Sequence, residues 1–286
     1  MPKTLYFYPA VMAGLLLGSA SAWGQAVSAR PLNDTGLTWS GTGTTGNSTT
    51  CNTADPAGQD CHYGRDAAAL ANTLTKTGAS ALNNGQANGF DFTKISNAGH
   101  ELAATATLGS NSDDWACTRD NVTGLTWEVK VNDPSHLRYS GHKYTWYNPD
   151  TATNGGFAGY ADQYWGNDVK WHSNADLCSG LTLCNMQAYA VAVNTQKLCG
   201  FEDWRIPTAE ELEGLIDHGR TNTSQPMIDP DYFPNTVINP DFPYLTTTSA
   251  SAAYPGYVWF VNFANGRVFF SYGVYPGSVY LVRGTP

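Results

Sequence analysis

The sequence predicts an α+β fold with two helices and small antiparallel sheets, preceded by a loop-rich N-terminal region. Apolar residues recur at helical spacing in 185–198 and 208–219, which indicates two amphipathic helices. The segments 115–129 and 258–272 each contain two strand-like runs joined by an Asn/Gly turn, the pattern of a β-hairpin. By contrast, 27–112 is rich in Gly, Ala, Thr, Asn and Ser, a composition typical of loops.

Residues 1–26 have the pattern of a secretory signal peptide. Lys3 precedes the apolar run 10–17, and small residues at 20–22 and 24–26 offer two sites for a signal peptidase. The run is too short for a good membrane span. Because no cysteine lies near either cleavage site, a lipoprotein is not expected. We therefore expect an exported soluble protein that is secreted, periplasmic or held at the cell surface.

Six cysteines come after the signal peptide, and an even number in an oxidising compartment favours three disulfides. Six cysteines allow 15 pairings. Cys51 and Cys61 are close in sequence, and so are Cys178 and Cys184, which favours a disulfide within each pair. Cys117 and Cys199 are then left as the third, distant pair. A zinc site is the alternative, and it is disfavoured because only His62 among the six histidines lies near a cysteine.

The charge balance argues against nucleic acid and other polyanions as partners. The chain has 24 acidic and 15 basic side chains, a formal net charge of −9, and no cluster of basic residues. Aromatic residues make up 13% of the chain and charged residues only 14%. This combination indicates a rigid, aromatic-rich extracellular module.

Several elements are predicted along the chain. In the N-terminal region, 89–95 alternates apolar and polar residues like a strand, so the region is interpreted as a weakly structured subdomain packed on the residues after 112. Residues 132–175 read as a long ordered loop region held by aromatic side chains. Asn185 is expected to cap a helix that ends at Leu198.

The second helix is predicted to begin at Thr208. Pro207 prevents an earlier start, and Glu211 three residues after Thr208 completes a capping box. Gly219 stands where a C-terminal cap is expected. The apolar face of this helix comprises Leu212, Leu215 and Ile216. The two residues before Ile206 and Pro207, Trp204 and Arg205, are interpreted as packing and bridging residues between the two helices.

The strands after Tyr254 carry the candidate ligand-binding residues. Both faces of this hairpin are apolar or aromatic, and strand periodicity divides them into two sets. The set expected to point inward is Trp259, Val261, Phe263, Val268 and Phe270. A face of aromatic and small polar side chains on rigid strands suits recognition, because aromatics give a large contact area at low entropic cost. The predicted ligand-binding residues are Tyr254, Tyr257, Phe260, Asn262, Arg267, Phe269, Ser271, Tyr272, Tyr275 and Tyr280. The alternative is that a second layer of the protein covers this face.

Five sequence blocks occur in order after the N-terminal region 27–112. They are Cys117…Asp120-Asn121…Thr123-Gly124-Leu125-Thr126-Trp127-Glu128, Leu198-Cys199-Gly200…Asp203-Trp204-Arg205-Ile206-Pro207-Thr208…Glu211-Leu212, Ile228-Asp229…Tyr232-Phe233-Pro234-Asn235-Thr236, Trp259…Val261…Phe263…Gly266, and Leu281-Val282-Arg283-Gly284. Together they resemble the Lcl C-terminal domain family over roughly 113–286. The resemblance implies a C-type-lectin-like fold, related to that of formylglycine-generating enzymes. Leu245 and Tyr280 depart from the family pattern, in which Trp and a basic residue are frequent, so the ligand of the family is not carried over.

A second resemblance concerns the C-terminal strands. In some exported proteins of the lectin fold, a retroelement diversifies surface positions near the C-terminus and favours Tyr, Asn and Ser. The positions of that kind here are Tyr254, Tyr257, Asn262, Ser271, Tyr272, Tyr275, Ser278 and Tyr280.

The sequence holds no Gly-x-Ser-x-Gly elbow, HExxH helix or phosphate-binding loop, so we expect no enzyme and no cofactor. Calcium is an alternative, since Asp229, Asp231 and Asp241 lie in Pro-rich turns, although turn formation explains these residues equally well. We expect an exported, non-catalytic recognition or adhesion module that binds a cell-surface glycan or protein. A retroelement-diversified receptor and a structural envelope component without a specific ligand are the alternatives.

Overall fold

The computed structural model describes residues 31–42, 46–48, 50–52, 54–56, 58–78, 88–220, 226–237 and 244–284. The chain divides into two compact units, 1–30 and 31–286, and every described residue belongs to the second. The predicted signal peptide lies outside the described residues.

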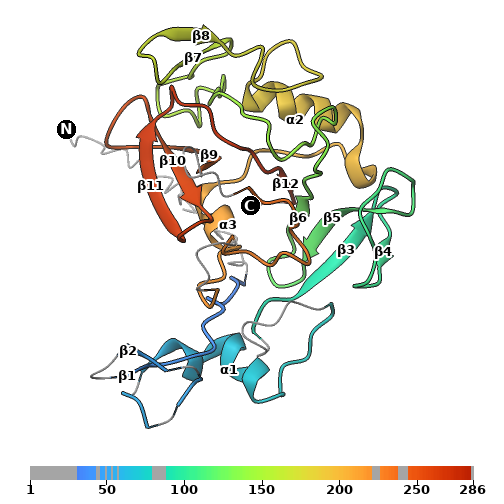
Figure 1. Ribbon diagram of the computed structural model, residues 1–286, viewed down its shortest axis with the longest axis vertical. Helices are drawn as coiled ribbons and strands as arrows, with labels where there is room; N and C mark the ends of the chain where they lie inside the picture. The colour runs from blue at the N-terminus through green and yellow to red at the C-terminus, as the bar shows by residue number, and fades with distance from the viewer. Residues whose placement is uncertain are drawn as a thin grey trace, which may run out of the picture. The chain divides into compact units, whose positions relative to one another are not determined.

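The larger sheet has five antiparallel strands in the order β12-β6-β5-β3-β4 (Figure 1). The strands are β3 (Phe92–Ser96), β4 (Glu101–Leu102), β5 (Trp115–Asp120), β6 (Thr126–Glu128) and β12 (Val282–Arg283). The predicted hairpin is confirmed in β5 and β6, where the Asp120 N–H donates to the Leu125 carbonyl at 2.8 Å. Because β3 pairs with β5, the sheet includes residues on both sides of position 112, and β12 ties the C-terminal segment to β6.

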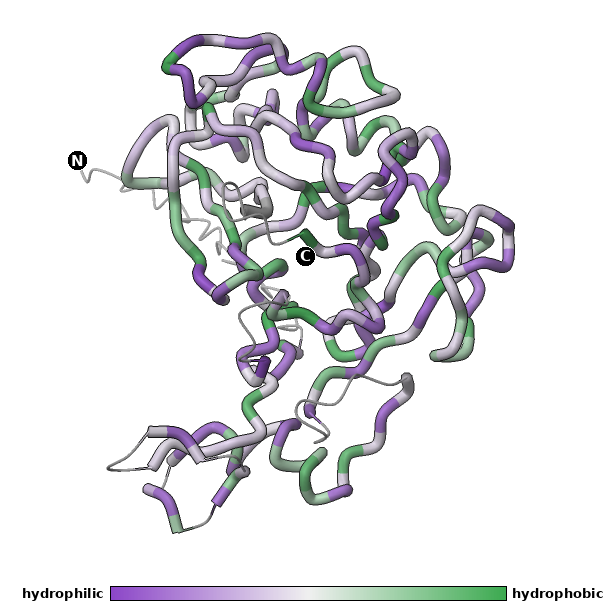
Figure 2. Tube along the Cα trace, in the orientation of Figure 1, coloured by the Kyte–Doolittle hydropathy of each residue, from purple (hydrophilic) through white to green (hydrophobic). Residues whose placement is uncertain are grey.

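A three-stranded antiparallel sheet forms from β9 (Tyr244–Ala250), β10 (Tyr257–Asn262) and β11 (Arg267–Tyr272), with β10 in the centre. The second predicted hairpin, β10–β11, is therefore confirmed. Figure 2 shows apolar stretches along both strands and a hydrophilic turn between them. Two further pairs of short strands are β1 (Gly41–Thr42) with β2 (Gly46–Asn47), and β7 (Gln163–Trp165) with β8 (Trp171–Ser173).

Both predicted helices exist, and both are shorter than the periodicity suggests. Helix α2 (Met186–Thr195) begins at its predicted cap, where the Asn185 side chain accepts from the Ala188 N–H. It ends before Leu198 because Lys197 adopts a left-handed conformation with φ 52°, and a 3₁₀ turn, η2 (Leu198–Gly200), comes next.

Helix α3 (Ala209–Glu213) has the predicted capping box of Thr208 and Glu211. It ends at Gly214, so Gly219 is not its cap, and the longer helix was wrong. Leu215 and Ile216 lie in the turns after the helix, yet they stay buried. The described part of the N-terminal region contains helical elements that were not foreseen, η1 (Asp60–His62) and α1 (Gly64–Leu70), and the short strands β1, β2 and β4 were not foreseen either.

The N-terminal region packs on the rest of the described chain through hydrogen bonds. The Asn33 side chain donates to the Asp120 carboxylate at 2.6 Å and to the Gly214 carbonyl at 3.0 Å. The His218 N–H donates to the Thr35 carbonyl at 2.8 Å. These contacts join the first described segment to β5 and to the residues after α3, as the interpretation of a packed subdomain requires.

The core consists of two clusters of buried apolar side chains. The first surrounds Trp146, Tyr189 and Phe260, and the second surrounds Phe92 and Trp127. The three predicted disulfides are confirmed as Cys51–Cys61, Cys117–Cys199 and Cys178–Cys184. Within the described residues, no helix is long and apolar enough to cross a membrane.

The junction between the helices contains the predicted packing and bridging residues. Trp204 is buried, and its ring N–H donates to the Leu198 carbonyl at 3.0 Å. Arg205 holds Glu211 through two hydrogen bonds of 2.8 and 2.6 Å and also donates to the Gly284 carbonyl. A bidentate guanidinium–carboxylate pair fixes geometry as well as charge, so α3 and the C-terminal segment are held in register.

Candidate recognition surface

The surface of the β10–β11 hairpin carries an aromatic patch, which comprises Tyr254, Tyr257, Trp259, Phe270 and Tyr272. Strand register places Tyr257 opposite Tyr272 and Trp259 opposite Phe270, so the four side chains share one face. Tyr254 precedes β10 and stacks on Phe270 with ring centroids 5.5 Å apart. Tyr254, Phe270 and Tyr272 are 53%, 41% and 51% exposed. The patch is therefore a contiguous group of solvent-facing aromatic rings.

Neighbouring rings within the aromatic patch support one another. The centroids of Tyr257 and Tyr272 are 4.1 Å apart, and those of Trp259 and Phe270 are 5.4 Å apart at a steep angle. A hydrogen bond with Tyr272 is the main reason why the pKa of Tyr257 is raised to about 12. The Tyr257 phenol is therefore neutral at physiological pH. The hydroxyls of Tyr257 and Tyr272 offer polar groups at the edge of an apolar surface.

The opposite face of the hairpin packs into the core, which reverses the predicted orientation of several residues. Phe260 is 1% exposed and stacks on Phe269 at 5.9 Å, so its expected outward position was wrong, as was the inward position of Trp259 and Phe270. Val261 and Phe263 are buried as predicted. Both faces are apolar in the sequence, and the face that exposes Phe270 at one end of the hairpin is buried at Val261 at the other, so periodicity did not determine which residues meet the core.

The ten predicted ligand-binding residues therefore fall into three groups. Tyr254, Tyr257 and Tyr272 belong to the aromatic patch, and Arg267 is exposed near the hairpin turn. Phe269, Ser271 and Tyr275 are partly buried. Phe260, Asn262 and Tyr280 are buried and do not reach the surface. The prediction omitted Trp259 and Phe270, whose apolar character made them resemble core residues.

Two of the buried residues have identifiable structural contacts. The Asn262 side chain accepts from the Ala264 N–H at 2.8 Å, which stabilises the turn between β10 and β11. The Tyr280 hydroxyl lies 2.8 Å from the Thr236 hydroxyl, and burial raises the pKa of Tyr280. Each contact explains the residue without a ligand.

A second series of aromatic rings lies in the segment 146–171 and reaches the three-stranded sheet. Trp146 stacks on Phe157, and Phe157 contacts Tyr160, which contacts Trp171. The backbone N–H of Trp165 donates to the carbonyl of Val274 at 3.1 Å. Val274 lies two residues after the end of β11. The β7–β8 hairpin is thereby attached to the end of β11 by a backbone hydrogen bond. The ring contacts from Trp146 to Trp171 agree with the expected loop region held by aromatic side chains.

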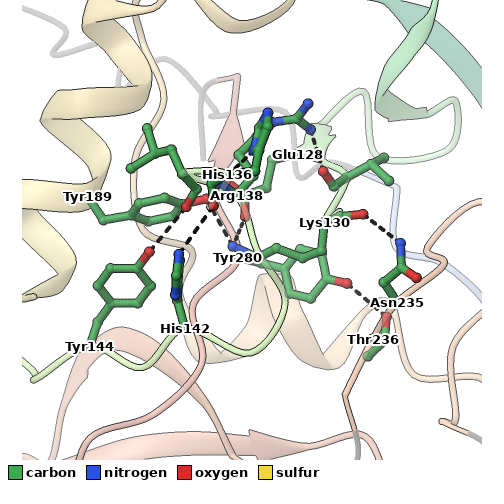
Figure 3. Close-up of polar contacts among 12 residues, drawn as sticks. Glu128, Lys130, His136, Arg138, His142, Tyr144, Tyr189, Asn235, Thr236 and Tyr280 are labelled. Carbon is green, nitrogen blue, oxygen red and sulfur yellow. Dashed lines mark hydrogen bonds and ion pairs between the residues drawn. The ribbon is translucent and has the colours of Figure 1, made fainter. Parts of the chain in front are cut away.

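A buried polar cluster joins β6 to α2 (Figure 3). Lys130 forms an ion pair with Glu128, and its ammonium donates to the Tyr189 hydroxyl at 3.0 Å. The same hydroxyl donates to the other Glu128 oxygen at 2.7 Å. Burial lowers the pKa of Lys130, an effect that the charge of Glu128 opposes. The cluster thus pairs a buried carboxylate with a buried ammonium and fixes α2 against the larger sheet.

Among the described residues, the carboxylates of Asp34, Asp60 and Asp66 lie close enough together to bind a metal ion. Asp66 accepts hydrogen bonds from the Gly36 and Gly89 N–H groups. Burial is the largest cause that raises the pKa of Asp66, to about 6. Of the predicted calcium ligands, Asp229 accepts from the Asp231 N–H at 2.9 Å, as a turn residue does, and Asp241 lies outside the described residues.

These features define a disulfide-linked α+β domain with an exposed aromatic patch. Residues 116–283, more than half of the chain, match the Lcl C-terminal domain, and the chain therefore belongs to the Lcl C-terminal domain family. The matched residues run from β5 to β12 and include the whole of the aromatic patch. No curated protein and no solved structure matches the chain.

Proposed function

We propose that the chain is an exported, non-catalytic recognition or adhesion module that binds a cell-surface glycan or protein through the aromatic patch. The observation that supports this function is the exposure of Tyr254, Phe270 and Tyr272 together on one face of the β10–β11 hairpin. Large contiguous apolar surfaces on soluble proteins commonly mark binding sites. The membership of the Lcl C-terminal domain family, a surface-protein family, agrees with this function.

The chemistry of the aromatic patch suits both ligand classes. Flat aromatic faces provide apolar contact area for the C–H face of a sugar ring or for an apolar side chain. The Tyr257 and Tyr272 hydroxyls add hydrogen-bonding groups beside that area. Tyrosine loses little conformational entropy on binding, because only two torsions become fixed.

The scaffold beneath the patch is rigid, which lowers the cost of binding. Phe260 is packed in the core directly across the sheet from the patch, and β10 is hydrogen-bonded on both sides. The β7–β8 hairpin is attached at the end of β11 through Trp165. A preformed surface retains more of its interaction free energy as affinity than a flexible one.

The proposal includes a C-type-lectin-like fold for the described α+β domain and export by the signal peptide at 1–26. Three disulfides are compatible with an extracellular location. We assign no cofactor, and calcium binding by Asp229, Asp231 and Asp241 stays a prediction.

A screen on glycan arrays and on immobilised cell-surface protein fractions tests this function. The wild-type protein is compared with Phe270→Ala, and Tyr63→Ala serves as the control because Tyr63 is 60% exposed outside the patch. We expect the wild type and the control to bind the same ligand and Phe270→Ala to lose the signal. Binding to no surface at all would favour a structural envelope component, and binding that survives Phe270→Ala would place the site elsewhere.

A further inference from the structure

A polar pocket of about 270 Å³ lies beside the η2 turn, and its lining is basic. Asn97, Ser110 and Ser112 contribute polar groups from the loops that flank β4 and β5, and Lys197 contributes from the start of η2. Gln196, His136 and Arg138 complete the polar lining. None of the described residues that line the pocket is acidic.

Arg138 is a buried cation with unused hydrogen-bond donors. The residue is 4% exposed, and its Nη1 donates to the Ala116 carbonyl at 3.1 Å and to the Val129 carbonyl. Its Nε and Nη2 groups find no acceptor among the residues that the structure describes. A guanidinium group carries five N–H donors, and buried donors normally have partners. The Nε and Nη2 groups of Arg138 are therefore available to donate to an acceptor in the pocket.

The charge of Arg138 also lacks a dedicated counter-ion. Glu128 is the carboxylate that most affects Arg138, and it is already paired with Lys130 and hydrogen-bonded by Tyr189. In the described parts of the chain, no carboxylate oxygen lies at ion-pair distance from Arg138. Since the two buried cations share one buried carboxylate, one positive charge remains uncompensated, which is costly in a protein interior.

His136 supplies a second donor to the same pocket. Its Nδ1 accepts from the Arg138 backbone N–H at 3.0 Å, so the proton of the neutral ring resides on Nε2. Burial, and after it the charge of Arg138, lowers the pKa of His136, which favours the neutral ring. A neutral imidazole adds an N–H donor without adding charge.

We propose that this pocket binds a carboxylate group, with the Nε and Nη2 groups of Arg138 as a bidentate donor pair and His136 as a further donor. The planar fork of a guanidinium matches the two oxygens of a carboxylate. The other cation of the lining, Lys197, is already paired with Glu202 at 2.7 Å. A single negative charge therefore balances the single uncompensated charge of Arg138, whereas a doubly charged phosphate would leave one charge unpaired. The pocket and the aromatic patch share no residue, so this site is independent of the proposed recognition surface.

Titration of ¹⁵N-labelled full-length protein with acetate tests the proposal, with the Arg138 Nε–H and His136 ring resonances as readouts. We expect both resonances to shift in a saturable manner. Ala98→Leu fills the pocket from an exposed position and leaves every hydrogen bond of Arg138 intact, so acetate affinity should fall at least tenfold. Ala152→Leu, an equivalent change at an exposed position away from the pocket, should bind acetate like the wild type.

Phosphate, sulfate and chloride serve as competing anions in the same titration. We expect acetate to bind more tightly than all three. No shift of the two resonances, or equal affinity in Ala98→Leu and the wild type, would overturn the pocket as an anion site. Tighter binding of phosphate or sulfate than of acetate would overturn the assignment to a carboxylate. Binding to glycans or cell surfaces through the aromatic patch is unaffected by any of these outcomes.

Discussion

Trp259 lies opposite Phe270 across the β10–β11 hairpin, with the two ring centroids 5.4 Å apart, and Phe270 is 41% exposed. On the next pair of the same strands, Phe260 lies opposite Phe269, and Phe260 is 1% exposed. Adjacent aromatic pairs on one hairpin therefore have different environments. A substitution at the buried Phe260 is therefore expected to lower stability, whereas a substitution at the exposed Phe270 is expected to affect binding.

Phe260→Ala is expected to lower the free energy of unfolding by about 3–5 kcal/mol, because it removes a buried ring and leaves a cavity. Phe270→Ala removes a partly exposed ring and should cost about 1 kcal/mol or less. Guanidinium chloride denaturation of both variants measures the difference. Equal destabilisation by the two substitutions would contradict the orientation of the hairpin.

The two disulfides of the family domain are expected to contribute unequally to stability. Cys117–Cys199 closes 82 residues and Cys178–Cys184 closes only 6. Loop-closure entropy gives about 4.5 kcal/mol for the long loop and about 2 kcal/mol for the short one. Paired Cys→Ala variants, compared by denaturation under oxidising conditions, test this order. A larger loss from the short loop would show that native-state contacts, not chain entropy, dominate.

Arg205→Lys should destabilise the junction between the helices, although the charge is retained. The substitution removes the bidentate contact with Glu211 and the hydrogen bond to the Gly284 carbonyl. Lysine presents a point charge and not a planar fork, so we expect a loss of about 1–2 kcal/mol in the free energy of unfolding. Lys170→Arg, at an exposed position, is the matched control and should change stability negligibly. Unchanged stability in Arg205→Lys would indicate that the charge alone matters.

Asp66 is expected to make stability depend on pH between about 4 and 6. Its folded-state pKa is raised from 3.8 to about 6, so over this interval the folded state binds more protons than the unfolded state. The contribution of Asp66 to stability is therefore fully present below about pH 4 and is lost as pH rises to about 6.

The Asp66→Asn variant tests the sign of this dependence. The change removes the titrating group but keeps one acceptor for the Gly36 or Gly89 N–H. The free energy of unfolding of Asp66→Asn, minus that of the wild type, should increase as pH rises from about 4 to about 6. A constant difference between the two proteins over this interval would contradict the raised pKa.

Local signals predicted the elements whose formation depends on neighbours in sequence. Asn185 and Thr208 cap α2 and α3 as expected, because a capping hydrogen bond involves residues only three positions apart. The turns of both hairpins were also predicted, since Asn and Gly tolerate the required backbone conformations. The disulfide pairing was predictable from cysteine spacing, which leaves one distant pair after two close ones.

Features decided by distant contacts were not predictable in the same way. The core, not the strand period, determines that Phe260 is buried and Phe270 is exposed. The end of α3 at Gly214 was hidden because Leu215 and Ile216 remain buried in the turns after the helix. The free donors of Arg138 depend on the positions of Glu128 and Lys130 in three dimensions, so no sequence pattern indicates the pocket.

The affinity of the Tyr272→Ala variant for the ligand found in the array screen tests the central claim most directly. Tyr272 is 51% exposed and contacts Tyr257, whereas the control Tyr63→Ala removes a similarly exposed ring elsewhere. We expect Tyr272→Ala to weaken binding at least tenfold, about 1.4 kcal/mol, with unchanged thermal stability. Tyr63→Ala should bind like the wild type. Equal affinities of all three proteins would contradict a recognition function for the aromatic patch.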